Sequence, residues 1–449
     1  MKSNNNSYKS LFDISNRSST IGSSLKTQSH SPINRIEKPI NENLKTSICI
    51  YCKSGKNLCG RNKCDLIEKA KAGLRNNKSR IALKIDGATP PSVFVGTSGY
   101  PDIYIGPMVP QYYDNTEILD TPERWIGKSV DEIINYRHSL TLGTKRINAL
   151  KTNLEERFVE NLQMIAMSSQ PIDTEVTLTK IPNTRITLNP EMQPFGPSAP
   201  IKHFKSSNFR VDTRIEKAYN DKDLLSREGI MNLYSQGVSI SRIQKAFSMG
   251  MFGLGKKRKL VPTRWSITAV ENNISLALLE EIKKSDTIDN YRVFSFRNLD
   301  NLFTVILSPE KWRLELLEAW HPGTIWNSNG TLPVIISDYE PFQGRNSYAK
   351  VGGSYYAARL AVTERLERDR RQASAIIFRE IQQGYKIPLG VWNIRESIRA
   401  AIRKKPDEFE SFHSALTHVN SVLTIKLDKW IEASTHLKET FIQRKISDY

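Results

Sequence analysis

Residues 92–106 read Ser-Val-Phe-Val-Gly-Thr-Ser-Gly-Tyr-Pro-Asp-Ile-Tyr-Ile-Gly, which is two short apolar runs joined by a polar turn. The runs at 92–96 and 102–106 are rich in β-branched and aromatic residues and are bounded by Gly or Pro, a pattern typical of β-strands. Further runs of this kind occur at 174–179, 184–188, 291–296, 303–307 and 332–337. The sequence therefore predicts a strand-rich central region.

Helical patterns surround these strands. A long helix is expected over about 129–168, the stretch 355–383 is nearly free of helix-breaking residues, and another helix should follow Pro388. From 406 to 443, apolar side chains recur at spacings of three, four or seven, which predicts an amphipathic helix. The expected fold class is α+β, with a mixed strand-rich central region, a four-cysteine zinc module near the N-terminus and a helical C-terminal region.

Length and composition indicate two or three domains. The chain has 449 residues, more than one compact core accommodates. Residues 1–46 are rich in Ser and Asn and poor in aromatics, which is typical of disorder. The predicted organisation is a disordered tail over 1–46, a zinc module over 47–68, an α+β domain over 69–335 and a helical region over 336–449.

The chain carries a large positive charge. A formal net charge of +18 and a pI near 9.6 attract polyanions, of which nucleic acid is the commonest and an anionic membrane surface is the rival. The alternative to a polyanionic partner is a positive surface that is simply solvated. No apolar run is long enough to cross a membrane, and the first thirty residues lack the apolar core of a secretory signal. We therefore expect a cytoplasmic, nucleoid-associated protein with no membrane partner.

All four cysteines lie between positions 49 and 64, in the pattern Cys49-x2-Cys52-x6-Cys59-x4-Cys64. Thiolates clustered this closely are typical of a structural zinc site, in which four sulfur ligands surround one ion. An iron–sulfur cluster uses the same ligands, and disulfides are a further alternative, although they favour exported proteins. We predict one structural zinc ion held by these four cysteines.

Residues 224–248 are expected to form two short helices joined by a turn at Gly237, with Ser239 as the N-cap of the second helix. The pattern resembles a helix-turn-helix, in which Ser241, Arg242 and Lys245 would face outward as DNA contacts. A plain αα-hairpin has the same signature, so both interpretations stay open.

Further segments combine cations with glycine or an aromatic residue. A glycine-rich stretch at 250–255 precedes four consecutive cations, and Pro262-Thr-Arg-Trp-Ser266 places a cation beside an aromatic ring; a solvated loop is the alternative for both. Three arginines four residues apart would form one helix ridge that needs an anion, either internal carboxylates or phosphate. The predicted nucleic-acid contacts are Arg242, Lys245, Lys256, Lys257, Arg258, Lys259, Arg264, Arg395, Arg399 and Arg403.

The turn at 96–102 is a candidate nucleotide or phosphate site, because it is rich in glycine and hydroxyl groups. Its candidate ligands are Gly96, Thr97, Ser98, Gly99 and Asp102. Other polar residues could converge, but none has catalytic spacing: His203, Asp212, His321, Asp338, Glu340 and Asp369. A capped turn or a surface role is the alternative for each, and the sequence leaves catalysis open.

The sequence ends Gln443-Arg-Lys-Ile446-Ser-Asp-Tyr449, which looks like the peptide that docks on the sliding clamp (PCNA). A single 3₁₀-like turn would place Ile446 and Tyr449 side by side for an apolar pocket, with Gln443 in a polar one. Such peptides usually carry two adjacent aromatics, whereas this one has a single aromatic. We predict that Gln443, Ile446 and Tyr449 bind the clamp.

Taken together, these segments resemble the Nre family of archaeal DNA repair proteins over nearly the whole chain after the tail. The resemblance rests on the four-cysteine segment, on 94–107, on 252–258, on 262–266 and on the terminal peptide. It implies a role in repairing DNA damage, recruitment by the sliding clamp, and a conserved N-terminal and C-terminal region. It implies no catalytic residue.

The favoured interpretation is a zinc-containing archaeal DNA repair protein that binds DNA and is recruited to the sliding clamp through its C-terminal peptide. Two alternatives stay open. One is a nucleotide-processing or nuclease-like enzyme with a site near 96–107, and the other is an RNA-binding or ribosome-associated zinc protein.

Overall fold

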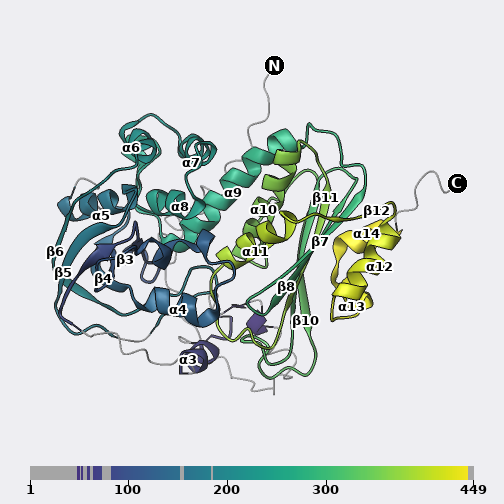
Figure 1. Ribbon diagram of the computed structural model, residues 1–449, viewed down its shortest axis with the longest axis horizontal. Helices are drawn as coiled ribbons and strands as arrows, with labels where there is room; N and C mark the ends of the chain where they lie inside the picture. Colours follow the sequence, from purple (N-terminus) through teal and green to yellow (C-terminus); the bar gives the residue numbers. More distant parts are fainter. Residues whose placement is uncertain are drawn as a thin grey trace, which may run out of the picture.

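The computed structural model describes residues 48–50, 52–53, 58–60, 64–72, 82–151, 156–183 and 186–442. The predicted tail at 1–46 and the clamp-like peptide at 443–449 lie outside these residues. Within them, the strands form two six-stranded sheets, and a layer of helices lies between the sheets (Figure 1). The predicted mixture of α and β elements is therefore confirmed.

The first sheet has the strand order β1-β5-β6-β4-β3-β2 and is antiparallel except where β4 pairs with β6. Its strands are β1 (Lys84–Thr89), β2 (Val93–Val95), β3 (Asp102–Val109), β4 (Thr141–Asn148), β5 (Ile172–Leu178) and β6 (Ser198–Ser207). β2 and β3 form the hairpin expected from 92–106, with Val95 opposite Ile105. Both side chains are fully buried in the main core. Successive side chains of a strand point to opposite faces of the sheet, and these two lie on the face that points into the protein.

The second sheet has the strand order β10-β9-β11-β8-β7-β12. Its strands are β7 (Tyr291–Asn298), β8 (Asn301–Ser308), β9 (Arg313–Trp320), β10 (Val334–Glu340), β11 (Ser374–Ile381) and β12 (Asp407–Phe409). In β8, Phe303 and Val305 belong to the main core, whereas Leu302 and Ile306 belong to a second core on the other face. A strand buried on both faces is a continuous apolar run, which explains why the sequence predicts β8.

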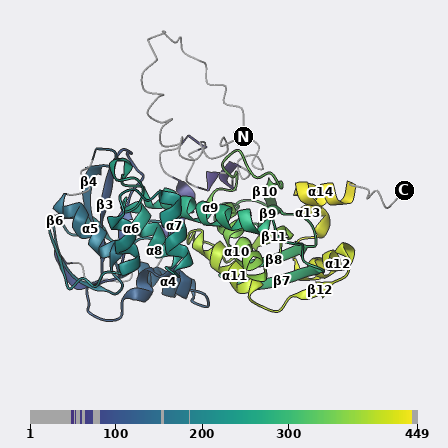
Figure 2. The ribbon, with the colours of Figure 1, turned by 90° about the horizontal axis from the view of Figure 1, so that it is seen from above.

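Helices α7 to α11 separate the two sheets (Figure 2). The 20-residue α9 packs against α7, α8 and α10, and so links both halves into one main core. No helix within the described ranges is long and apolar enough to cross a membrane. The helices are α3 (Asp65–Ala72), α4 (Val130–His138), α5 (Arg157–Met167), α6 (Thr213–Asn220), α7 (Ser226–Ser235), α8 (Ile240–Ser248), α9 (Thr263–Ile282), α10 (Gly353–Asp369), α11 (Trp392–Ile402), α12 (Phe412–Val422), α13 (Leu427–Ala433) and α14 (Thr435–Ile442), with short 3₁₀ turns η1 (Glu117–Asp120), η2 (Pro122–Arg124) and η3 (Gly255–Lys257).

Three predicted helices are wrong in their extent. The stretch 129–168 contains α4, the strand β4 and α5, and 355–383 contains most of α10 and the strand β11. The stretch 406–443 divides into β12, α12, α13 and α14. In the predicted strand 184–188, Thr187 forms only an isolated bridge, and 184–185 lie outside the described residues. β4 and β11 are interior strands with a neighbour on each side, so tertiary pairing overrides their local helical pattern.

The predicted boundary between 335 and 336 falls inside β10. Strands from both sides of it build the second sheet, because β11 inserts between β8 and β9, parallel to β9 and antiparallel to β8. The region predicted as helical, 336–449, therefore also contributes strands. Among its described residues, it is purely helical only from Phe412 onward.

Helices α12 to α14 cover the outer face of the second sheet (Figure 1). Trp430 of α13 is fully buried there, and its ring centre lies 5.2 Å from that of Phe378 in β11. At the start of α14, the backbone N–H groups of Thr435 and His436 donate to the carboxylate of Glu315 at 2.9 and 3.0 Å. A negative charge at the N-terminus of a helix is stabilising. The helix that precedes the terminal peptide is thus anchored to the sheet.

Candidate nucleic-acid interface

The hairpin of α7 and α8 turns its predicted DNA contacts toward the protein, so the prediction that they face outward is wrong. Ser241 is buried, and the longer cations of α8 are only partly exposed. Each finds a carboxylate within 3 Å: Ser241 with Glu123, Arg242 with Asp212, and Lys245 with Asp120. Apolar packing around α8 leaves the polar side chains facing these acids, so the plain αα-hairpin interpretation fits the geometry.

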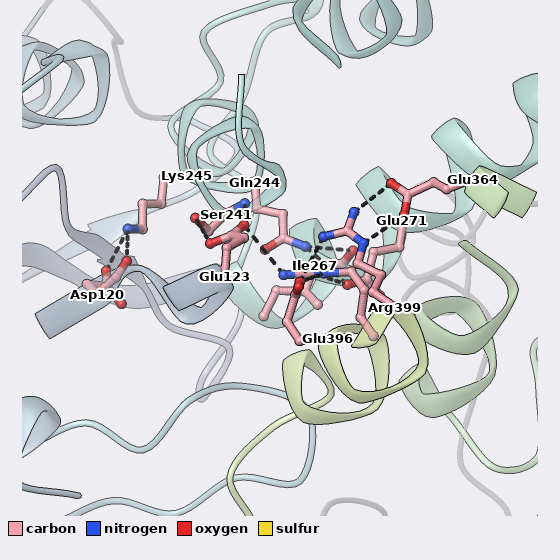
Figure 3. Close-up of polar contacts among 11 residues, drawn as sticks. Asp120, Glu123, Ser241, Gln244, Lys245, Ile267, Glu271, Glu364, Glu396 and Arg399 are labelled. Atoms are coloured by element: carbon pink, nitrogen blue, oxygen red, sulfur yellow. Dashed lines mark hydrogen bonds and ion pairs between the residues drawn. The ribbon is translucent and has the colours of Figure 1, made fainter. Parts of the chain in front are cut away.

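Two arginines of α11 also point inward, into a buried network of charges (Figure 3). The guanidinium of Arg395 contacts Glu271 at 2.5 Å and Glu396 at 2.7 Å. Arg399 donates to Glu364 at 2.6 Å and to Glu396 at 2.8 Å. The anions that the arginine ridge requires are therefore internal carboxylates rather than phosphate.

Four of the other predicted cations are exposed, whereas Arg258 is partly buried. Arg258 donates to the carbonyls of Gly253 and Tyr219 at 2.7 and 2.6 Å, and these hydrogen bonds fix the loop against the C-terminal end of α6. Its neighbours extend outward from this fixed loop. The exposed predicted cations are Lys256, Lys257 and Lys259 around η3, and Arg403 after α11.

The cysteine segment is fastened to the second sheet through Lys53. Its Nζ donates to Glu318 at 2.6 Å and to the carbonyl of Val351 at 2.9 Å. Glu318 is fully buried and also accepts a hydrogen bond from Arg379 at 2.7 Å. Burial lowers the pKa of Lys53, although the charge of Glu318 opposes this shift. The residue next to Cys52 is thus a structural anchor.

The four cysteines are thiols, with Cys52 buried, Cys49 and Cys64 half-buried, and Cys59 exposed. Within the described residues, no group of three or more Cys, His, Asp or Glu side chains is placed so that it could hold a metal ion. The structure therefore does not gather the predicted zinc ligands. Zinc remains a prediction from the chemistry of the donor set.

Segments that are far apart in the sequence meet at the start of α10, around a hollow that we call the Gly352 pocket. Gly352 adopts a φ of 75°, which favours glycine, and is the residue from which α10 begins. Three cations and one carboxylate line the pocket, although Lys53 is paired with Glu318 and Arg264 with Glu191; the N-terminus of α10 adds positive potential. Its lining includes Cys52, Lys53, Glu191, Arg264, Lys350 and Ser354. The pocket is therefore suited to an anion.

Exposed aromatic rings accompany this pocket. Trp265, next to Arg264 in the chain, is 41% exposed, and its ring centre lies 4.8 Å from that of Tyr100. Tyr348, two residues before Lys350, is 42% exposed. Trp265 follows Arg264 in the first turn of α9, although its side chain does not line the pocket.

In the 96–102 turn, the ring of Tyr100 packs against that of Trp265. The backbone N–H groups of Gly96, Tyr100 and Asp102 already donate to carbonyls within the hairpin. The carboxylate of Asp102 accepts a hydrogen bond from Asn148 at 2.9 Å. The candidate ligands do not line the Gly352 pocket: Gly96, Thr97, Ser98, Gly99 and Asp102. Their role in binding a nucleotide stays a prediction.

The other polar residues considered for catalysis lie on different elements, and several are held in ion pairs. Asp212 caps α6, Glu340 contacts Arg359, and Asp369 contacts Arg365. Their positions are His203 in β6, Asp212 before α6, His321 after β9, Asp338 and Glu340 in β10, and Asp369 at the end of α10.

Sequence reasoning missed Glu191 and the stretch 350–354. Lys350-Val-Gly-Gly-Ser354 carried a usable signal, since two glycines before a helical run indicate a close backbone approach at a helix start. Glu191 carried none. Its carboxylate lies at the pocket, where it accepts a hydrogen bond of 2.5 Å from Nε of Arg264, 73 positions later in the chain.

Comparisons with known proteins identify one family. Residues 58–327 match the family described as "Archaeal Nre, N-terminal", and residues 340–449 match "Archaeal Nre, C-terminal". No solved structure matches the chain.

Individual relatives agree. DNA repair protein NreB of Archaeoglobus fulgidus is 43% identical over 87% of this chain and 97% of that protein. DNA repair protein NreA of the same organism is 38% identical over 82% of this chain and 92% of its own length. DNA repair protein NreA of Haloferax volcanii is 32% identical over 76% of this chain and 83% of its own length. This chain therefore belongs to the archaeal Nre family.

Proposed function

We propose that this chain acts in DNA repair and binds DNA at the Gly352 pocket and the cations around it. Three relatives with this family's sequence are named DNA repair proteins. A net charge of +18 favours a polyanionic partner, and release of counterions from DNA would drive the association.

The observation that carries this proposal is the meeting of separate segments at one pocket. The Pro262–Ser266 run brings Arg264, the cysteine segment brings Lys53, and the start of α10 brings Lys350. Lys53 is paired with the buried Glu318, so it positions the cysteine segment beside the pocket rather than contacting phosphate. Lys350 is exposed and can reach phosphate oxygens, whereas Arg264 is 22% exposed and would contact phosphate while it stays paired with Glu191.

Replacing Arg264 and Lys350 together with Gln is expected to weaken binding of mixed-sequence DNA by about 10-fold near 0.1 M salt. The slope of log affinity against log salt should fall by about 2, since each lost phosphate contact removes close to one unit. Fluorescence anisotropy with a labelled oligonucleotide at several salt concentrations measures both quantities.

Two checks accompany this experiment. Lys284→Gln removes an exposed lysine at the far end of α9 and should leave the slope nearly unchanged. Thermal unfolding of the double variant verifies that it folds. An unaltered slope in the folded double variant would remove the Gly352 pocket from the proposal.

The clamp-like peptide is proposed to tether the protein to the sliding clamp. Gln443, Ile446 and Tyr449 follow directly after α14, whose start is fixed by Glu315. A peptide that extends from an anchored helix can dock on another protein without disturbing the fold.

Deleting residues 443–449 is expected to abolish pull-down of an archaeal sliding clamp and to leave the melting temperature unchanged. Tyr449→Ala alone should weaken the interaction by about 10-fold or more, because a buried aromatic anchor dominates such contacts. Lys445→Ala, at a spacer position of the motif, is the matched control. Normal pull-down by the deletion variant would refute the tether.

The four cysteines are proposed to hold one structural zinc ion, on the strength of their number, type and spacing. Elemental analysis of the purified protein is expected to find one zinc per chain, and a variant with all four cysteines changed to Ser should contain none. Iron in place of zinc would favour a cluster, and absence of both metals would end this proposal.

A further inference from the structure

We propose that the surface around Trp265 selects unpaired nucleotides, so that the preferred DNA is single-stranded or carries unstacked bases. This inference rests on the proposed DNA-binding function and adds the class of substrate. It starts from a large aromatic side chain that is partly open to solvent: Trp265 lies in the first turn of α9 and is 41% exposed.

The position of this ring suits stacking. Tyr100 supports it at 4.8 Å between ring centres, with an angle of 57° between the rings, so Trp265 is braced on one side and open on another. The brace comes from a hairpin turn whose backbone N–H groups donate within the turn. A supported, exposed indole offers its surface to a planar partner at little entropic cost, because its own rotamer is already restricted.

Cations near the same end of α9 favour a nucleotide over an apolar ligand as the planar partner. Arg264 is the neighbour of Trp265 in the chain, and Lys350 lines the same pocket as Arg264. A base stacked on an indole carries a phosphate within reach of nearby cations, and this pairing of aromatic rings with a basic groove is the usual way to bind single strands. Tyr348, 42% exposed, offers a second ring near Lys350.

A duplex would use this surface poorly. Its bases are stacked on each other, so only the phosphates could contact Arg264 and Lys350, and Trp265 would face the sugar-phosphate backbone. The absence of an outward-facing recognition helix in the α7–α8 hairpin, within the described residues, agrees with this reasoning. Stacking therefore distinguishes the two forms of DNA.

The test compares a single strand, its duplex and the RNA of the same sequence, using the full chain and anisotropy at fixed salt. The wild-type protein should bind the single strand more tightly than the duplex. Trp265→Leu should lose about 10-fold on the single strand, the effect of one stacked base, and less than about 2-fold on the duplex. Trp265→Phe should recover most of the loss. Phe441→Leu removes an exposed ring on α14 and serves as the control.

The possible failures are distinguishable. No binding of any DNA by the wild-type protein would overturn the proposed function itself. Binding of DNA with equal losses on single strand and duplex, or with no loss on either, would overturn this inference alone. Tighter binding of the RNA than of the single-stranded DNA would also overturn it, because the partner would then be RNA.

Discussion

Replacing Arg395 with Met is expected to lower the free energy of unfolding by about 3 to 5 kcal/mol at pH 8. The Arg395 side chain is 1% exposed and contacts Glu271 and Glu396, which are also buried. Met fills a similar volume but leaves Glu271 without its ion-pair partner, whereas Glu396 keeps Arg399 at 2.8 Å. Denaturant unfolding followed by circular dichroism measures the loss.

The loss should shrink as the pH falls. Burial raises the pKa of Glu271 to about 7 although Arg395 opposes the shift, so removing Arg395 raises this pKa further. A carboxyl whose pKa is higher in the folded protein stabilises the fold when protonated. Its contribution is full below the unfolded pKa of 4.5 and is lost as the pH rises through the folded pKa. The variant should therefore be closer to the wild-type protein at pH 5.5 than at pH 8.

The same helix provides the control. Arg403 follows α11 and is exposed, so Arg403→Met should change stability by no more than about 0.5 kcal/mol. Adding Glu271→Leu to the Arg395 variant should recover part of the loss, since the two sites are directly coupled. Equal losses at both pH values, or no recovery, would show that buried charge is not the cause.

Replacing Glu318 with Gln is expected to cost about 3 to 5 kcal/mol as well, because two buried cations, Lys53 and Arg379, would lose their shared carboxylate. The variant should also release the cysteine segment from the second sheet. Maleimide labelling of Cys52, which is 7% exposed in the intact fold, should then speed up by about 10-fold.

Two comparisons make this result specific. After a chelator has removed any bound metal, the exposed Cys59 gives an internal reference for the labelling rate. Glu281→Gln removes one side of an exposed ion pair with Lys284 and should change neither stability nor labelling appreciably. A destabilised Glu318 variant with unchanged Cys52 labelling would mean that other contacts hold the segment.

The elements that the sequence predicts well are those whose pattern is local. The hairpin at 92–106 combines alternating burial with Gly and Pro boundaries, and β8 is apolar on both faces. The sequence predicts helix at β11, because 355–383 is nearly free of helix-breaking residues. In the structure Arg379 pairs with Glu318 on β9, and Glu380 accepts a hydrogen bond from the backbone N–H of Thr424 at 2.9 Å. Such long-range partners are invisible in a single sequence.

Only part of the candidate interface can be predicted from the sequence, because here too some of the deciding contacts are long-range. Arg264 and its aromatic neighbour stand out because a cation and a large ring rarely adjoin a helix start without purpose. Arg242, Arg264 and Arg395 look equivalent in the sequence, and each pairs with an acid more than 29 positions away: Asp212, Glu191 and Glu271. Charge density along a chain indicates a basic protein, whereas the acids that neutralise individual cations are determined by the fold.

Neither family region can complete the second sheet by itself. The earlier region provides β7, β8 and β9, and the later one provides β11, which occupies the slot between β8 and β9. A truncation between the two regions would leave unpaired strand edges on both products, and such edges recruit strands from other molecules. A unit to be expressed, labelled or exchanged between relatives must consequently contain strands from both family regions.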